Sequence, residues 1–178
     1  MHGEPADPQI APEPFEPGSQ WVPLRAGWIS ATGGPSRARL QGWPARGATD
    51  VLTLQRGDEM QPWLPELCRE HGLQFIHLPL SGRRMDQPGD RDSLARLPAL
   101  LALWDQPRRV VVHCSAGLHR TGGICYLLLR LAGLGRDEAV ARVRLARALT
   151  AEELCRAARS GVLIDRMDER LAGYPCAS

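Results

Sequence analysis

The chain has 178 residues, 43% of them hydrophobic, which is typical of one globular domain. Its formal net charge is +2, so no strong overall field favours nucleic acid or a membrane surface as a partner. The 22 basic residues are all arginine, which excludes a Walker-type lysine and a Schiff-base lysine. Arginine-only usage with abundant Ala, Leu and Gly indicates a GC-rich, bacterial genome.

The first twenty residues differ in composition from the rest of the chain. They are rich in proline and acidic residues and contain no Lys or Arg. This composition predicts a disordered tail over residues 1–20 and a single folded domain over residues 21–178. The N-terminus has neither a basic start nor an apolar stretch, so we expect no secretory signal, and we expect no transmembrane helix.

In the first half of the domain, apolar runs separated by turn residues predict three strand regions and one helix. The strand regions lie within residues 21–30, 48–55 and 73–80. The helix spans residues 62–71 and ends before Gly72.

A longer helix is predicted before the last strand. Leu94, Leu97, Leu101 and Trp104 recur at spacings of 3, 4 and 3, which places them on one face of a helix. Pro98 fits this helix only in its first turn or at a kink.

The second half of the chain adds one strand and three helices. We predict a buried strand over residues 109–114, a buried helix over 124–134, and helices over 137–149 and 151–171, with Thr150 as the cap of the last one. Alternation of strands and helices predicts an α/β fold. We expect a central, mostly parallel, twisted sheet of four to five strands with helices on both faces.

The segment HCSAGLHRTG, from His113 to Gly122, connects the last strand to the buried helix. A free cysteine has a pKa of about 8.5, and a helix N-terminus or nearby cations can lower that pKa to roughly 3.5–7.5. Cys114 stands where both would act. A loop at this end of a strand also directs backbone N–H groups at an anion. The sequence therefore predicts a phosphate site with a sulfur nucleophile.

Each residue of this loop has a predicted part in binding. Arg120 offers a planar fork for two phosphate oxygens, and Thr121 places a hydroxyl beside the sulfur. His113 is expected to orient the loop by hydrogen bonding. The predicted phosphate-binding residues are Ser115, Ala116, Gly117, Leu118, His119 and Arg120. The close spacing of Cys114 with the two histidines does not fit a structural metal site, and we expect neither metal nor cofactor.

The segment resembles the signature loop of the cysteine-dependent protein tyrosine phosphatases, which reads His-Cys, five residues, Arg, Ser or Thr, Gly. The short chain resembles the dual-specificity branch, over roughly Trp28 to Leu145. The resemblance implies hydrolysis of phosphotyrosine, or also phosphoserine and phosphothreonine, on proteins. It implies that Cys114 forms a phosphocysteine, Arg120 holds the phosphoryl group and Thr121 assists release.

The reaction also needs a carboxylic acid to protonate the leaving oxygen. In the resembled family this acid is an Asp on a mobile loop just beyond a strand, but the corresponding positions here hold Ser81 and Gly82. Asp86 is our first candidate because the turn-prone residues after it can present it on a hinged loop. Asp90 and Asp92 are the alternatives.

Other functions remain open on the same residues. Without a placed Asp, the chain would be a phosphate-recognition module with no turnover. Related loops also serve phosphoinositides and RNA 5′-phosphates. A rhodanese-like sulfur carrier or an arsenate reductase uses a loop of cysteine and arginine as well, although the Thr121-Gly122 continuation favours the phosphatase.

The cysteines bear on the compartment of the protein. The chain has five, with no C-x-x-C pair, and a thiolate nucleophile needs a reducing environment. We therefore expect a cytoplasmic monomer whose partner is a phosphorylated protein, without nucleic acid. Cys68 and Cys125 are candidates for a protective disulfide with oxidised Cys114, or are small buried hydrophobes.

Overall fold

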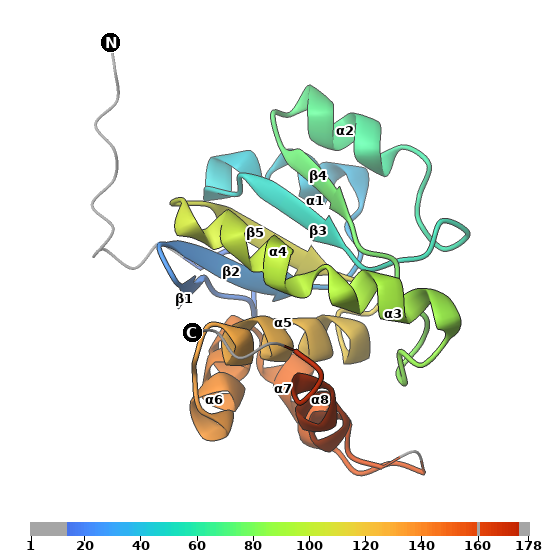
Figure 1. Cartoon of the computed structure of the whole chain (residues 1–178). Helices are drawn as coiled ribbons and strands as arrows, with labels where there is room; N and C mark the ends of the chain where they lie inside the picture. Colours follow the sequence, from blue (N-terminus) through green and yellow to red (C-terminus); the bar gives the residue numbers. More distant parts are fainter. Residues whose placement is uncertain (1–13, 160, 175–178) are drawn as a thin grey trace.

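The computed structural model describes residues 14–159 and 161–174 and contains one five-stranded sheet (Figure 1). Its strands are β1 (Val22–Leu24), β2 (Gly27–Thr32), β3 (Asp50–Thr53), β4 (Gln74–His77) and β5 (Arg109–His113). They lie in the order β1-β2-β5-β3-β4. β1 pairs antiparallel with β2, and all other pairs are parallel. The predicted mostly parallel sheet is confirmed.

Helices cover both faces of this sheet, as predicted. The structure has α1 (Arg37–Gln41), α2 (Leu64–Glu70), α3 (Pro88–Ala95), α4 (Leu97–Leu101), α5 (His119–Leu131), α6 (Arg136–Ala146), α7 (Ala148–Cys155) and α8 (Leu163–Leu171), with 3-10 turns η1 (Pro44–Arg46) and η2 (Ala102–Asp105). In Figure 1, α5 to α8 lie together on one side of the sheet and α2 lies on the other. No helix in the described part of the chain is both long enough and apolar enough to cross a membrane.

Alternation along β5 divides the core between the two faces. Val110 and Val112 are buried against the face that carries α3 to α8, whereas Val111 is buried against α1 and α2. Successive side chains of a strand point to opposite faces, and β5 is central, so all three valines are fully buried. An apolar run in the sequence is what such a strand requires.

Several predicted helix boundaries are wrong: the buried helix expected over residues 124–134, for example, is α5, which begins five residues earlier and ends at Leu131. The helix expected over residues 151–171 is two helices, because the backbone is extended at Arg156 and Gly161 has a φ of 88°. That left-handed conformation is readily adopted by glycine and ends helical geometry. Thr150 lies inside α7, so it is not the cap that we expected. The preceding helix ends at Ala146.

The apolar positions from Leu94 to Trp104 are also divided among shorter elements. α3 ends at Ala95, and α4 and η2 follow almost directly. Pro98 occupies the first turn of α4, where its missing N–H would have no helical partner. At this position the proline is compatible with the predicted helical spacing of the apolar residues.

The packed body begins before Trp21, the residue at which we expected the domain to start. Phe15 is fully buried, with its ring centroid 4.8 Å from that of Trp21 and 5.5 Å from that of Trp43. The Glu16 carboxylate accepts from Trp43 Nε1 at 2.8 Å and from Arg39 Nη2 at 2.6 Å. Residues 14–20 therefore belong to the folded domain. The remainder of the predicted tail, residues 1–13, lies outside the described residues.

Candidate active site

The loop from Cys114 to Leu118 connects β5 to α5 at the carboxyl edge of the parallel strands, where open α/β sheets usually bind ligands. Gly117 makes the turn possible. Its φ is 69°, and a Cβ atom there would lie 2.3 Å from the Thr32 carbonyl oxygen. Any larger residue would therefore push the loop away from β2.

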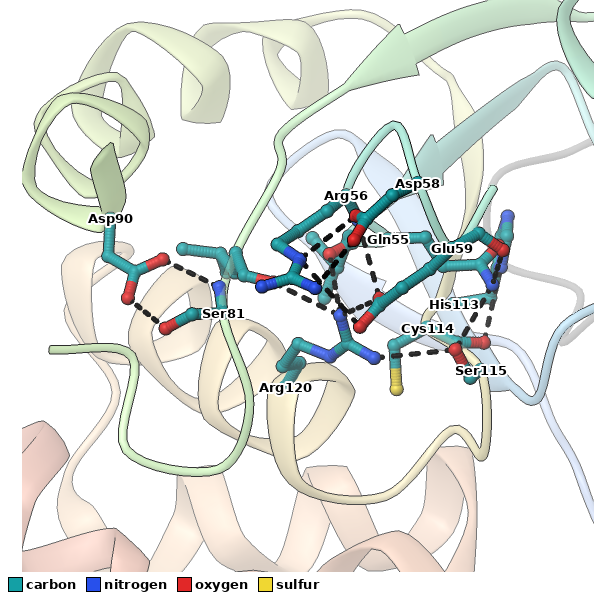
Figure 2. Close-up of polar contacts among 12 residues, drawn as sticks. Gln55, Arg56, Asp58, Glu59, Ser81, Asp90, His113, Cys114, Ser115 and Arg120 are labelled. Atoms are coloured by element: carbon teal, nitrogen blue, oxygen red, sulfur yellow. Dashed lines mark hydrogen bonds and ion pairs between the residues drawn. The ribbon is translucent and has the colours of Figure 1, made fainter. Parts of the chain in front are cut away.

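Cys114 is 3% exposed and lies at the centre of the site (Figure 2). Burial acts to raise the pKa of its thiol, but the Thr121 hydroxyl and amide and the Leu118 amide outweigh burial. Together with the Arg120 charge they hold the pKa below that of an ordinary cysteine. The Gly117 amide donates to the sulfur at 3.2 Å. Thr121 Oγ1 is buried without a well-aligned hydrogen bond among the described residues, so the backbone amides are the firmer donors to the resting sulfur.

Arg120 is held from the side opposite the sulfur. Its Nη1 donates to the Glu59 carboxylate and to the Leu80 carbonyl, the latter at 3.0 Å. Its Nη2 lies 3.4 Å from Ser115 Oγ, beside Cys114 (Figure 2). This clamp fixes the guanidinium plane while leaving an edge turned toward the loop, as binding of two phosphate oxygens requires.

Glu59 is a residue of the site that the sequence did not predict. It lies on the segment that follows β3, and its short ion pair with Arg120 joins residues 61 positions apart. The available signal was the run of polar residues directly after a buried parallel strand, because such strands end at the same edge of the sheet.

The outer side of the loop is fixed by two residues from the start of α7. Arg147 Nη1 donates to the carbonyls of Ala116 at 3.1 Å and Gly117 at 2.8 Å, and Thr150 Oγ1 donates to Gly117 at 2.6 Å. Since these carbonyls point outward, the loop amides are directed inward, where an anion would bind.

His113 supports the loop in its neutral form. Its side chain is fully buried, and burial lowers its pKa to about 4. Nδ1 lies 3.4 Å from the Cys114 carbonyl oxygen, and Nε2 has no partner among the described residues. The predicted orienting hydrogen bond is thus long, and the ring acts mainly by packing, 6.3 Å from the ring of Trp43.

A pocket of about 130 Å³ opens over the loop. Its lining residues are Gly82, Arg83, Cys114, Ser115, Ala116, Leu118, His119 and Arg120. The structure thus brings the predicted nucleophile, the predicted arginine and most of the predicted loop residues to one cavity. A neighbouring hollow of about 280 Å³ shares Ser115 and extends past Glu59 to Trp63. Over residues 14–159 and 161–174 no group of three or more His, Cys, Asp or Glu side chains is placed to hold a metal ion.

The three candidate acids are not among the residues that line this pocket. Asp86 lies 2.9 Å from Arg84 Nε with 38% of its side chain exposed. Asp90 is 3% exposed, and its carboxylate accepts from the amides of Ser81 at 2.6 Å and Gln87 at 2.8 Å. This makes Asp90 a structural cap that ties the 81–87 loop to α3, as Figure 2 shows for its contacts with Ser81. Asp92 is exposed on α3.

The loop that carries Asp86 is anchored at further points. The Met85 side chain is fully buried and its φ is 49°. Arg170 Nη2 donates to the carbonyls of Arg84 at 2.9 Å and Met85 at 2.7 Å. In this arrangement Asp86 is held on the outside of the loop.

The other described cysteines are free thiols. Burial raises the pKa of Cys68 and of Cys125 to about 12, which disfavours their thiolate forms, whereas the pKa of Cys114 is lowered. Cys155 is exposed, and Cys176 lies outside the described residues.

Comparison with known proteins places the chain among phosphatases. A model of the tyrosine phosphatase family matches residues 74–166. No curated protein matches the chain significantly.

Three solved structures illustrate the similarity of fold. Tk-PTP in its G95A mutant form is 21% identical, with a TM-score of 0.62 over 89% of this chain and 99% of that one. A putative phosphatase (DUF442) from Shewanella putrefaciens is 17% identical, with a TM-score of 0.59 over 89% and 94%. The core catalytic domain of the PP-IP phosphatase SIW14 from S. cerevisiae is 19% identical, with a TM-score of 0.53 over 94% and 99%.

Proposed function

The chain belongs to the tyrosine phosphatase family, and we propose that it hydrolyses phosphomonoesters through a phosphocysteine formed on Cys114. The observation that carries this proposal is the lowered pKa of a buried thiol inside a loop of inward amides, beside a clamped arginine. A thiolate is the reactive form of cysteine, and that setting favours it relative to an ordinary cysteine.

In the first step the Cys114 thiolate attacks phosphorus while the bond to the leaving oxygen breaks. The amides from Ser115 to Arg120 and the Arg120 guanidinium would stabilise the equatorial oxygens. Their positions are set before substrate arrives, because Arg147, Thr150 and Glu59 hold them from outside the pocket.

In the second step water attacks the phosphocysteine and sulfur leaves as the thiolate. The Thr121 hydroxyl would then donate to the departing sulfur. Its Oγ1 is buried next to the site without a well-aligned partner among the described residues, which leaves it available for this contact.

We propose phosphotyrosine on proteins as the substrate, with phosphoserine and phosphothreonine as further substrates of the same pocket. The neighbouring hollow lined by Gln55, Gln61 and Trp63 suits residues that flank a phosphorylated side chain. A phosphate-recognition role without turnover is disfavoured because the Cys114 thiol and the Arg120 guanidinium both lie at the pocket.

A second candidate is a small molecule that carries several phosphates, such as a phosphoinositide or another polyphosphorylated ring, with RNA 5′-phosphate as a related possibility. Arg83 and His119 line the pocket beside Arg120, which adds positive charge around the bound phosphate. SIW14, one of the similar structures, is described as a PP-IP phosphatase.

We further propose that the protein works as a monomer in the cytoplasm. The described cysteines are all free, and a reducing compartment would preserve the Cys114 thiolate.

The direct test measures hydrolysis of a phosphotyrosine peptide, a phosphoserine peptide and an aryl phosphate. We expect turnover by the wild type and none by Cys114→Ser, while the exposed-thiol control Cys155→Ser retains full activity. Turnover by Cys114→Ser would exclude the mechanism. Sulfur transfer from thiosulfate in place of phosphate release would favour the rhodanese-like function instead.

A further inference from the structure

The proposed chemistry lacks a proton donor at the pocket. An alkoxide or phenolate needs a proton as it departs, and a positioned acid typically contributes about 10²–10⁴-fold to the rate. Asp86 and Asp92 are exposed outside the pocket lining, and Asp90 is occupied as a structural cap. The donor must therefore be sought among the residues that do line the cavity.

His119 is the lining residue of suitable chemistry. Among the described residues that line the pocket it carries the one imidazole, a group that can both donate and accept a proton. It is the first residue of α5, directly before Arg120, and its side chain is 34% exposed.

The position of His119 at the mouth suits a leaving group. Phosphoryl transfer proceeds in line, so the departing oxygen lies opposite the attacking sulfur. Cys114 is 3% exposed at the base of the pocket, and the departing oxygen would therefore emerge at the open end. The partly exposed lining residues are Arg83, Leu118 and His119, and of these side chains the imidazole is the one that can both donate and accept a proton.

The imidazole of His119 is oriented by a carboxylate that is not one of the three predicted acids. Glu153 on α7 is 13% exposed, and its Oε2 lies 3.1 Å from His119 Nε2. Arg156 Nη1 holds the other carboxylate oxygen at 3.1 Å. Arg83 Nη1 lies 3.3 Å from the same imidazole nitrogen, and Arg120 adds a further positive charge next in sequence.

A guanidinium can only donate, so in the protonated imidazole Nε2–H pairs with the Glu153 carboxylate and the contact with Arg83 opens, which leaves Nδ1–H for substrate. Nδ1 makes no hydrogen bond with any described residue. A carboxylate that holds one imidazole nitrogen while the second transfers a proton is the pattern by which histidines act as acid and base in enzymes.

We propose that His119, held by Glu153, is the general acid and base of the phosphatase reaction, in place of Asp86. The inference rests on the proposed phosphocysteine mechanism. As the S–P bond forms and the P–O bond breaks, Nδ1–H gives its proton to the leaving oxygen. The neutral imidazole then takes a proton from the water that attacks phosphorus, and the S–P electrons return to Cys114 as thiolate. His119 is thus a catalytic residue, and Glu153 is a positioning residue.

The test compares two aryl phosphates whose leaving groups differ in basicity. A more acidic phenol such as p-nitrophenol departs readily without a proton, whereas phenol needs one. We expect His119→Asn to lower kcat/KM for phenyl phosphate about 100-fold and for p-nitrophenyl phosphate less than about tenfold. The ratio of the two values is independent of the fraction of folded enzyme, so partial unfolding of the variant does not mimic the result.

The pH profile gives a second readout. With His119→Asn, kcat/KM for phenyl phosphate should lose its basic limb, which reports deprotonation of the acid. Glu153→Gln should raise the selectivity for the better leaving group in the same direction but less, and Glu152→Gln, an exposed neighbour on α7, should match the wild type.

Equal losses for both substrates in His119→Asn, or no loss, would overturn the assignment. A selective loss for phenyl phosphate in Asp86→Asn but not in His119→Asn would return the role to Asp86. Neither result would touch the phosphocysteine mechanism, whose own failure would appear as turnover by Cys114→Ser.

Discussion

At the scale of single residues, the reactivity of Cys114 depends on hydrogen bonds that outweigh burial. Cys125 lies on the next helix, and burial raises the pKa of its thiol to about 12. The thiol of Cys114 is nearly as buried, yet its pKa is lowered by the Thr121 hydroxyl and the amides of Thr121 and Leu118, with help from Arg120. The difference between the proposed nucleophile and a core cysteine is thus the direction of nearby dipoles.

Thr121→Ala should affect both steps of the reaction. Because the hydroxyl lowers the pKa of Cys114, its removal should raise that pKa and move the acidic limb of kcat/KM to higher pH. Loss of a donor to the departing thiolate should also lower kcat, by roughly 10–100-fold for about 1.5–3 kcal/mol. The measurement is a pH profile with an aryl phosphate. Thr121→Ser keeps the hydroxyl and should follow the wild type; an unchanged acidic limb in Thr121→Ala would count against this role.

Residue chemistry was the part of the site that could be predicted. Cys114, Arg120 and Thr121 lie within one short segment, so their spacing alone brings them together. Glu59 and Glu153 reach Arg120 and His119 across 61 and 34 positions. Pairs of this kind depend on tertiary packing: the polar run after β3 indicates that Glu59 lies at the edge of the site, but not that it pairs with Arg120.

At the scale of elements, the start of α7 acts as a brace for the loop from Cys114 to Leu118. Thr150 was expected to cap this helix, but it lies within α7 and donates outward to the Gly117 carbonyl at 2.6 Å. A Thr followed by Glu three residues later has the pattern of a capping box. This pattern is the same whether the Thr hydroxyl caps its own helix or, as here, donates to another segment. The position of the Gly117 carbonyl decides between the two, and that position depends on the tertiary fold.

Thr150→Val should weaken the site through this brace. The variant keeps the shape of the side chain but leaves the Gly117 carbonyl with Arg147 as its remaining side-chain donor. Since one donor remains, we expect a loss of stability of about 1 kcal/mol and weaker inhibition by inorganic phosphate. Urea unfolding and competition with phosphate measure the two effects. Thr150→Ser should restore both, and a Val variant with normal phosphate affinity would show that the brace is dispensable.

At the scale of the whole molecule, the fold places reactive groups from distant segments at one edge of the sheet. The loops after β3, β4 and β5 contribute Glu59, Arg83 and Cys114, respectively. This convergence is a general property of parallel strands, and it explains why the fold class and the location of the site were predictable. β5 lies centrally, so its loop is flanked on both sides by the ends of neighbouring strands.

The N-terminal boundary of the folded domain was predicted less well, because the average composition of a segment does not show that one of its residues is buried. Residues 1–20 are rich in proline and acids, yet Phe15 fills the core between two tryptophans and Glu16 pairs with Arg39. One buried aromatic residue outweighs the polar composition around it, since burying its ring contributes about 1.5–3 kcal/mol. The apolar cluster in which Phe15 packs also includes Leu64 and Val111, which lie far along the chain.

The central claim, that Cys114 carries the phosphoryl group, is tested most directly by trapping the intermediate. The enzyme is mixed with a rapidly cleaved aryl phosphate, quenched within the first turnover, digested and analysed by mass spectrometry. We predict a phosphorylated peptide that contains Cys114, absent in Cys114→Ser and retained in Cys155→Ser. Full release of the phenol with no phosphate on Cys114 at any quench time would contradict the account.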